Sequence, residues 1–130
     1  TNVLLYAVST DPGEAVKREQ ARRLMGRGDV ALSTQVLGEF YVNATRARGP
    51  AMDHRQAVAI LKSLRGYPIA ALTEAVVWHA LDLRERFGVS YWDGCVLAAA
   101  ISLGCRTVYS EDLNDGQSYD GVKVVNPFRD

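Results

Sequence analysis

Three carboxylates are the residues of this 130-residue sequence whose positions best suit chemistry. Asp93 opens a segment that is typical of a buried helix, and Asp112 follows a short apolar run nineteen residues later. Glu39 lies beside the apolar stripe of an earlier predicted helix. Oxygen ligands without a neighbouring imidazole or thiolate select hard cations such as Mg²⁺ or Mn²⁺. In acid-only sites such ions commonly assist phosphodiester cleavage, because they activate water and stabilise the leaving oxygen.

Asp93 has a structural interpretation as well. Ser90 and Asp93 match a capping box, with Ser90 as the N-cap and Asp93 as the third helical residue. An acid in the first turn also suits the helix dipole. A buried, unpaired carboxylate is costly, however, which favours a partner or a metal. Both interpretations stay open, because capping and metal binding can coexist. The apolar stripe that Asp93 opens, and that we expect to face the core, contains Val96, Leu97, Ala100 and Gly104.

The elements that would position these acids alternate between helices and strands. Amphipathic patterns predict helices, in addition to the one that Asp93 opens, over residues 14–26, 35–46, 54–64 and 74–87. Short apolar runs predict strands or extended chain over residues 29–32, 67–72, 106–109 and 121–125. This order predicts an α/β fold with three α/β/α layers and a mainly parallel central sheet. Such sheets bind ligands beyond the carboxyl ends of their strands, where we expect the three acids to share one cleft.

Composition and charge exclude several classes of protein. The 48% hydrophobic fraction and the length suit one domain with a full core. Lysine plus arginine equals aspartate plus glutamate, at 15 each, so a nucleic-acid partner would need a local basic patch. Cys95 and Cys105 lie ten residues apart, which fits neither a zinc pair nor a disulfide framework. We expect no membrane segment and no signal peptide, and a cytoplasmic protein.

Other catalytic motifs are not found in the sequence. It contains no glycine-rich phosphate loop, no Gly-x-Ser-x-Gly and no Cys/His dyad. We interpret His54 as a surface residue, and Trp78 and His79 as packing residues without a partner at ligand spacing. The three acids therefore form the candidate site.

Five segments, in order along the whole chain, carry a resemblance to a known family. They are Thr1–Ala7, Ser33–Asn43, Ser90–Asp93, Tyr109–Asp112 and Val125–Phe128. Their combination resembles a PIN domain, in particular the VapC-type toxins of bacterial toxin–antitoxin pairs. The resemblance implies an endoribonuclease that depends on Mg²⁺ or Mn²⁺, cleaves an RNA substrate and is held inactive by a cognate antitoxin.

The resemblance also implies roles for individual residues. The catalytic, metal-binding acids of the family map onto Glu39, Asp93 and Asp112, and Asp115 matches a position that is acidic in some members. Glu39 would bind the metal or position the attacking water. Hydrogen bonds that support these acids are expected from Asn2, Asn43 and Ser110. The candidate RNA contacts are Arg18, Arg22, Arg46 and Arg48.

One departure from the family concerns the start of the sequence. The family motif is Asp-Thr-Asn, whose aspartate ends the central first strand, and this sequence begins at Thr1. We therefore expect a single PIN-like domain over residues 1–130 that lacks this strand and its metal-binding aspartate. Cleavage by this chain should be weaker than by one in which that aspartate precedes Thr1. The family also implies a short helix over Val3–Ala7, although the apolar pattern there fits a buried strand equally well.

Two other functions remain open at this point. A non-catalytic PIN-like module would act by binding a partner or by dimerising, and the missing aspartate favours it. A homodimer is also expected from the family and from aromatic residues on the middle helices, such as Tyr41 and Trp78. A receiver-like signalling domain fits least, because Lys123 is a poor match for the lysine that such a domain needs.

Overall fold

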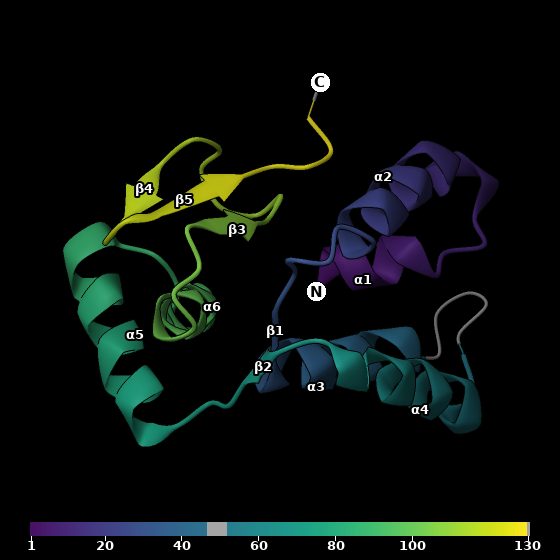
Figure 1. Cartoon of the computed structure of the whole chain (residues 1–130), viewed down its shortest axis with the longest axis horizontal. Coiled ribbons are helices and arrows are strands. Elements are labelled where there is room, and N and C mark those ends of the chain that lie inside the picture. Colours follow the sequence, from purple (N-terminus) through teal and green to yellow (C-terminus); the bar gives the residue numbers. More distant parts are fainter. Residues whose placement is uncertain (47–51, 130) are drawn as a thin grey trace. The chain divides into compact units, whose positions relative to one another are not determined.

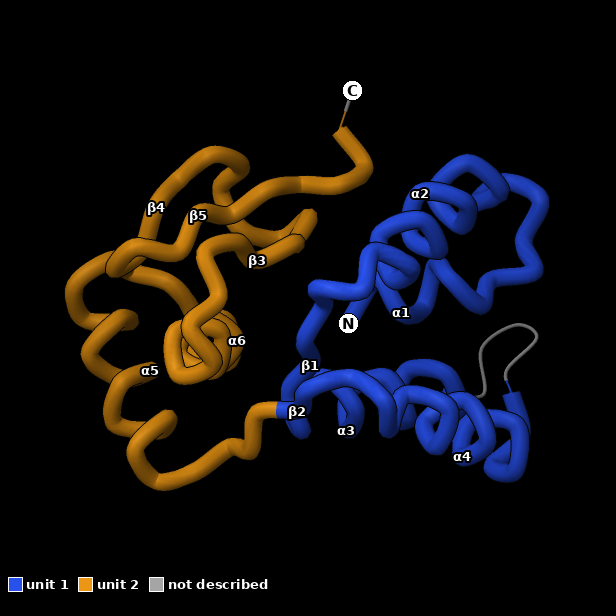
Figure 2. Tube along the Cα trace, viewed as in Figure 1, with its two compact units in different colours: residues 1–69 blue, residues 70–130 orange. Residues whose placement is uncertain are grey.

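Two structural units divide the chain, one formed by residues 1–69 and the other by residues 70–130. The computed structural model describes residues 1–46 and 52–129 (Figure 1). Figure 2 shows the two units in separate colours. Across the described residues, the first unit is mainly helical, and the second combines helices with a three-stranded sheet.

Helices of the first unit begin where the sequence places capping side chains. The Ser33 hydroxyl accepts a hydrogen bond of 3.2 Å from Val36 N. Asp53 and Gln56 form a reciprocal capping box at the start of the next helix. Both caps satisfy N–H donors that a helix start otherwise leaves unpaired. The helical elements of this unit are α1 (Asn2–Ala7), η1 (Pro12–Glu14), α2 (Ala15–Met25), α3 (Thr34–Ala44), α4 (His54–Ser63) and η2 (Leu64–Gly66).

The core of the first unit gathers side chains from three of these elements. Leu4 of α1, Phe40 of α3 and Leu64 of η2 are buried together. Strands β1 (Leu32–Ser33) and β2 (Ile69–Ala70) form a two-stranded sheet. The expected strand over residues 29–32 is therefore wrong in its position, because only its last residue is paired.

The second unit is built on the close packing of α5 (Glu74–Phe87) against α6 (Tyr91–Ser102). Gly94 lies where the two helices approach, since a Cβ added there would lie 2.7 Å from the carbonyl oxygen of Ala80. A side chain at this position would push the helices apart. Gly88 ends α5 at a φ of 73°, a left-handed conformation that glycine adopts without steric cost.

The sheet of the second unit has the strand order β3-β5-β4. Strand β3 (Thr107–Tyr109) pairs in parallel with β5 (Val122–Val125), and β4 (Ser118–Tyr119) pairs with β5 antiparallel. Asp120 and Gly121 join β4 to β5 with φ values of 48° and 89°, as two-residue hairpins favour. Helix α6 packs against β3 and β5. The core here includes Val76, Leu83, Leu97, Val108, Tyr119, Val122 and Val124.

The structure confirms the α/β class, the parallel pairing and the short helix at the N-terminal end, where α1 covers Asn2–Ala7. Strand β4 was not predicted. The prediction of a single core-facing stripe on α6 is wrong, because Gly104 is exposed and lies beyond the end of the helix. Buried residues of α6 lie on several sides and comprise Gly94, Cys95, Leu97, Ala98 and Ala99.

Trp78 of α5 also differs from its predicted packing role. The exposed fractions of Trp78 and of Leu81 on the same helix are 63% and 41%. The face that α5 buries carries Val76, Ala80 and Leu83. None of the helices in the described parts of the chain is long and apolar enough to cross a membrane.

Candidate functional site

Asp93 lies half-buried in the first turn of α6. The Ser90 hydroxyl accepts a hydrogen bond of 3.1 Å from the backbone N–H of Asp93, which confirms the predicted N-cap. Within the described chain, the second bond of a capping box, from the Ser90 backbone N–H to the Asp93 carboxylate, is not formed. Capping of α6 therefore leaves this carboxylate available for another partner.

The charge of Asp93 acts on a buried neighbour. Tyr119 of β4 is 1% exposed. Burial raises the pKa of the Tyr119 hydroxyl, and the negative charge of Asp93 raises it further. Asp93 thus interacts electrostatically with a residue of the core of the second unit.

Asp112 is exposed in the loop that follows β3. Its backbone N–H donates a hydrogen bond of 3.1 Å to the Ser110 hydroxyl. The backbone N–H of Ser110 donates in turn to Val125 O at 3.1 Å, which attaches the start of the loop to β5. Ser110 was expected to bond a carboxylate; here it supports Asp112 through the main chain.

Glu39 lies half-buried in the middle of α3. Its Oε1 atom accepts a hydrogen bond of 2.7 Å from the Thr1 hydroxyl, at the start of α1. Asn43 donates to the backbone oxygen of Glu39 at 2.9 Å and not to its carboxylate. Asn2, another residue that was expected to support an acid, is the first residue of α1. Thr1 was not among the predicted supporting residues, although it precedes Asn2 in the motif that carries the resemblance.

The acids belong to different units. Glu39 lies in the first unit, and Asp93, Asp112 and Asp115 lie in the second. The single cleft expected for them stays a prediction.

Asp115 holds the chain that follows β5. Its Oδ1 atom accepts a hydrogen bond of 2.8 Å from the backbone N–H of Asn126. Its Oδ2 atom lies 3.4 Å from Arg129 Nη1. The Asn126 N–H, and to a smaller extent Arg129, lower the pKa of Asp115. The structure therefore shows that Asp115 ties the loop after β3 to the chain that follows β5.

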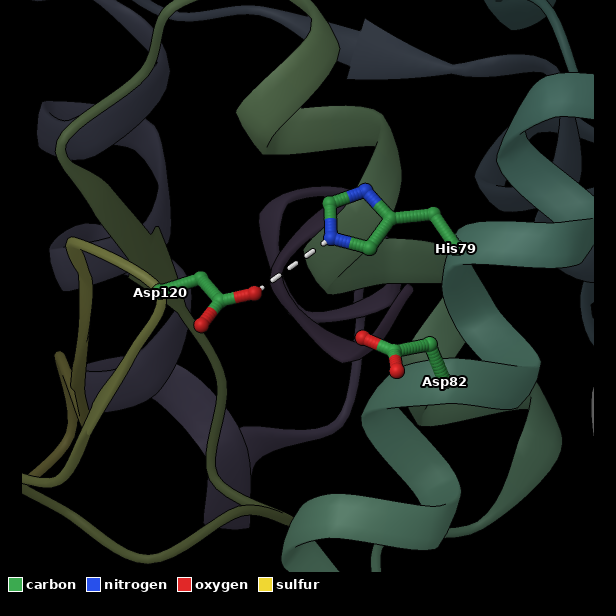
Figure 3. A group of neighbouring side chains, drawn as sticks. All are labelled: His79, Asp82 and Asp120. Atoms are coloured by element: carbon green, nitrogen blue, oxygen red, sulfur yellow. Dashed lines mark ion pairs between the residues drawn. The ribbon is translucent and has the colours of Figure 1, made fainter.

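A second group of potential ligands lies on α5 and the turn between β4 and β5. Figure 3 shows His79, Asp82 and Asp120 directed toward one another. Their ligand atoms all lie within 4.8 Å of one another, and His79 Nε2 is 3.5 Å from Asp120 Oδ2. The prediction that His79 has no partner at ligand spacing is therefore wrong. Asp82 lies one helical turn beyond His79, and Asp120 reaches it only through the fold.

Arg86 already donates hydrogen bonds to both carboxylates of this group. Its two terminal nitrogens donate to the two oxygens of Asp120 at 2.7 and 2.5 Å, and Nη1 also donates to Asp82 at 3.0 Å. Two-pronged contacts of this kind are among the stronger charged hydrogen bonds. Arg86, followed by His79, lowers the pKa of Asp120. We call these four residues the Arg86 network; it ties α5 to the β4–β5 turn, and a metal ion would have to displace Arg86.

Comparison with protein families matches most of the chain. Residues 1–114 match the PIN domain. The chain belongs to the PIN domain family. Glu39, Asp93 and Asp112 lie within the matched range, whereas Asp115 and Asp120 follow it. Among curated proteins, none matches this sequence.

Two solved structures have the same fold as this PIN domain. A toxin–antitoxin complex from Klebsiella pneumoniae is similar with a TM-score of 0.70 and 18% identity, over 98% of this chain and 93% of that chain. VapC20 of Mycobacterium tuberculosis, described as a toxin that cleaves the sarcin–ricin loop, is similar with a TM-score of 0.60 and 23% identity. That similarity covers 85% of each chain. At these identities the likeness establishes the fold.

The basic residues of the PIN domain divide by what they contact. Arg22 Nε donates to the backbone oxygen of Ala7, the last residue of α1, at 2.8 Å. Arg18 Nη1 donates to the backbone oxygen of Ser9, just beyond the helix, at 3.1 Å. Cations are favourable there, because the last carbonyls of a helix lack intrahelical partners. Arg46 is exposed after the end of α3, and Arg48 lies outside the described residues. Arg18 and Arg22 therefore have structural contacts in addition to their predicted RNA contacts.

Proposed function

We propose that this PIN domain is a metal-dependent endoribonuclease of the toxin type, in which Asp93 and Asp112 bind Mg²⁺ or Mn²⁺. The observation that carries the proposal is the family match over residues 1–114, which contains both acids and Glu39. Similarity in fold to a toxin–antitoxin complex and to a toxin described as cleaving an RNA loop supports RNA as the substrate.

The candidate residues suit a hard divalent cation. Asp93, Asp112 and Glu39 offer carboxylate oxygens alone, the ligand type that Mg²⁺ and Mn²⁺ prefer. The hydrogen bond that caps α6 joins the Asp93 N–H to the Ser90 hydroxyl and does not involve the Asp93 carboxylate. This carboxylate can therefore serve as an oxygen ligand at the start of the helix. A bound ion would supply an activated water and stabilise the leaving oxygen of the phosphodiester.

The fold restricts the position of each acid separately. Asp93 precedes Gly94, which the close contact with Ala80 fixes against α5. Ser110 holds the backbone of Asp112. The Thr1 hydroxyl orients the carboxylate of Glu39, which we assign to metal binding or to positioning the attacking water. Such restriction favours catalysis, because a misplacement of about 1 Å can reduce the rate by about 10²-fold.

We also propose that the chain acts as one PIN domain with protein partners. Similarity to a toxin–antitoxin complex over 98% of the chain supports neutralisation by a cognate antitoxin. Exposed Trp78 and Leu81 on α5 offer apolar surface for a homodimer. Light scattering tests the dimer: a monomer at high protein concentration would contradict it. RNA contacts are assigned to the predicted arginines, of which Arg22 and Arg46 are exposed.

RNA cleavage tests the proposal. The proteins are this chain and a version preceded by an apolar strand ending in aspartate, each unchanged, with Asp93→Asn and with Asp82→Asn. Asp82→Asn is the matched control, because it removes the same charge from a neighbouring helix of the same unit. We expect Mn²⁺-dependent cleavage, stronger in the extended chain, lost with Asp93→Asn and retained with Asp82→Asn.

Two outcomes would contradict the proposal. Cleavage that withstands both a chelator and Asp93→Asn would exclude the assigned metal site. A folded, Mn²⁺-loaded extended chain that cleaves no RNA would favour the non-catalytic binding module instead.

A further inference from the structure

The loop of residues 110–116, which carries Asp112, is attached to β5 at both ends; we call it the Asp112 loop. Ser110 N donates to Val125 O at 3.1 Å, and Gly116 N donates to Val124 O at 2.8 Å. Between these ends, Leu113 packs against the core of the second unit. Backbone hydrogen bonds at both ends restrict the conformations that the loop can adopt.

The side chain of Asp115 makes a third attachment between the Asp112 loop and the rest of the second unit. Its Oδ1 atom accepts the hydrogen bond of 2.8 Å from Asn126 N, directly after the last residue of β5. The Asn126 side chain in turn accepts a hydrogen bond of 2.9 Å from Phe128 N. Asp115 therefore joins the Asp112 loop to the turn that begins where β5 ends.

Both carboxylate oxygens of Asp115 have a partner in the protein. Oδ1 bonds the Asn126 N–H, and Oδ2 lies 3.4 Å from the Arg129 guanidinium. The N–H dipole and the positive charge stabilise the ionised carboxylate, as the lowered pKa of Asp115 indicates. The same groups oppose a second cation at this carboxylate, because like charges repel.

We propose that Asp115 is a positioning residue for Asp112 and does not bind the metal itself. It holds the Asp112 loop to the end of β5 through the Asn126 N–H, so that Asp112 keeps one position relative to the sheet. This inference rests on the proposed function, in which Asp112 is a metal ligand.

Two substitutions at position 115 separate positioning from metal binding. Asn keeps a side-chain oxygen for the Asn126 N–H but loses the charge of a carboxylate ligand, whereas Ala loses both. We expect Asp115→Asn to keep the Mn²⁺ affinity and the RNA cleavage of the unchanged protein. Asp115→Ala should lose about 10–100-fold in affinity or activity, the range that is usual for residues supporting a metal ligand. Asp112→Asn is the reference for a lost ligand, and Arg129→Ala should have little effect because the Asn126 bond remains.

Amide hydrogen exchange of Asn126, measured by NMR, reads the attachment without catalysis. We expect slow exchange in the unchanged protein and in Asp115→Asn, and fast exchange in Asp115→Ala. If Asp115→Ala does not fold, slow exchange and full Mn²⁺ affinity in Asp115→Asn still support the proposal.

Three results would overturn it. Asp115→Asn could lose as much Mn²⁺ affinity as Asp112→Asn, which would make Asp115 a ligand. Asp115→Ala could match the unchanged protein in affinity and cleavage, which would exclude positioning. The Asn126 amide of the unchanged protein could exchange fast, which would exclude the attachment. Failure of the proposed function is distinguishable, because the unchanged protein would then neither bind Mn²⁺ nor cleave RNA while Asn126 exchange still reported the attachment.

Discussion

Asp93 and Asp120, two carboxylates of the same unit, have opposite surroundings. Both oxygens of Asp120 are bonded to Arg86, and one lies 3.5 Å from His79. The cap of α6 leaves the Asp93 carboxylate outside its hydrogen bonds. Asp120 belongs to a cluster of potential ligands, yet Asp93 lies within the PIN match and Asp120 does not. Proximity of ligand-type side chains and the family match therefore point to different acids. We propose that Asp93 holds a cation and that Asp120 holds the structure through Arg86.

The largest expected effect separates these two acids by metal binding. Asp93→Asn should remove Mn²⁺ binding and reduce RNA cleavage by roughly 10²-fold or more, since even small misplacement of reacting groups has an effect of that order. Asp120→Asn should leave both unchanged, because the Arg86 network has no part in the proposed site. Calorimetric Mn²⁺ titration and RNA cleavage measure the difference. Loss of Mn²⁺ binding and cleavage with Asp120→Asn but not with Asp93→Asn would contradict the comparison.

The next effect concerns the helix packing that positions Asp93. Gly94→Ala places a Cβ 2.7 Å from the Ala80 backbone oxygen, so we expect it to lower the free energy of unfolding by about 1–3 kcal/mol. Gly38→Ala is the matched control, because a Cβ on this helical glycine meets no atom within 4 Å. It should raise the free energy of unfolding by about 0.5–1 kcal/mol. Urea unfolding that shows Gly94→Ala to be neutral would contradict the close approach of α5 and α6.

A smaller effect tests the Arg86 network through pH. The pKa of Asp120 is lowered in the folded state, so its ion pair contributes stability above the unfolded pKa of about 3.9. That contribution is lost as the pH falls through the lowered, folded-state pKa. Asp120→Asn should therefore have a lower Tm than the unchanged protein near pH 7, and the difference should close as the pH falls below about 4. The group is exposed, so added salt should also reduce the difference. A Tm difference that is constant with pH would exclude the ion pair as its cause.

The smallest expected effect is that of Zn²⁺ on the same network. His79 with two carboxylates is a ligand set that Zn²⁺ accepts, but Arg86 occupies both carboxylates. Any rise in Tm that Zn²⁺ causes by binding elsewhere should therefore be the same in the unchanged protein and in His79→Ala. A rise in Tm that disappears with His79→Ala would identify the Arg86 network as a metal site and would contradict the contrast drawn between Asp93 and Asp120.

Helix starts were largely predictable from the sequence. Ser90 was predicted as an N-cap and accepts the expected backbone hydrogen bond. Ser33, Asp53 and Thr73 are also of the residue types that N-caps favour, and each accepts the equivalent bond. These caps are readable because they depend on residues within one helical turn. Strand β4 was missed, because two residues have no measurable periodicity. The Asp120–Gly121 pair was the hairpin signal that would have identified it.

The sequence by itself determined the chemistry that this protein can offer. Its motif segments indicated the PIN family, and the oxygen-only character of Glu39, Asp93 and Asp112 predicted a hard cation. Both conclusions rest on residue types and short spacings, which a linear chain displays directly.

Only the tertiary structure decided which carboxylates already have hydrogen-bond partners within the protein. Arg86 reaches Asp120 across 34 residues, and Asn126 reaches Asp115 across 11. Whether an acid has a partner depends on distances of about 3 Å, because hydrogen bonds weaken steeply beyond that range. Residues so far apart in the sequence come that close only after the helices and strands have packed. The sequence could therefore name Glu39, Asp93, Asp112 and Asp115 as candidates, but only the fold showed that Asp115 and Asp120 join segments far apart in the chain.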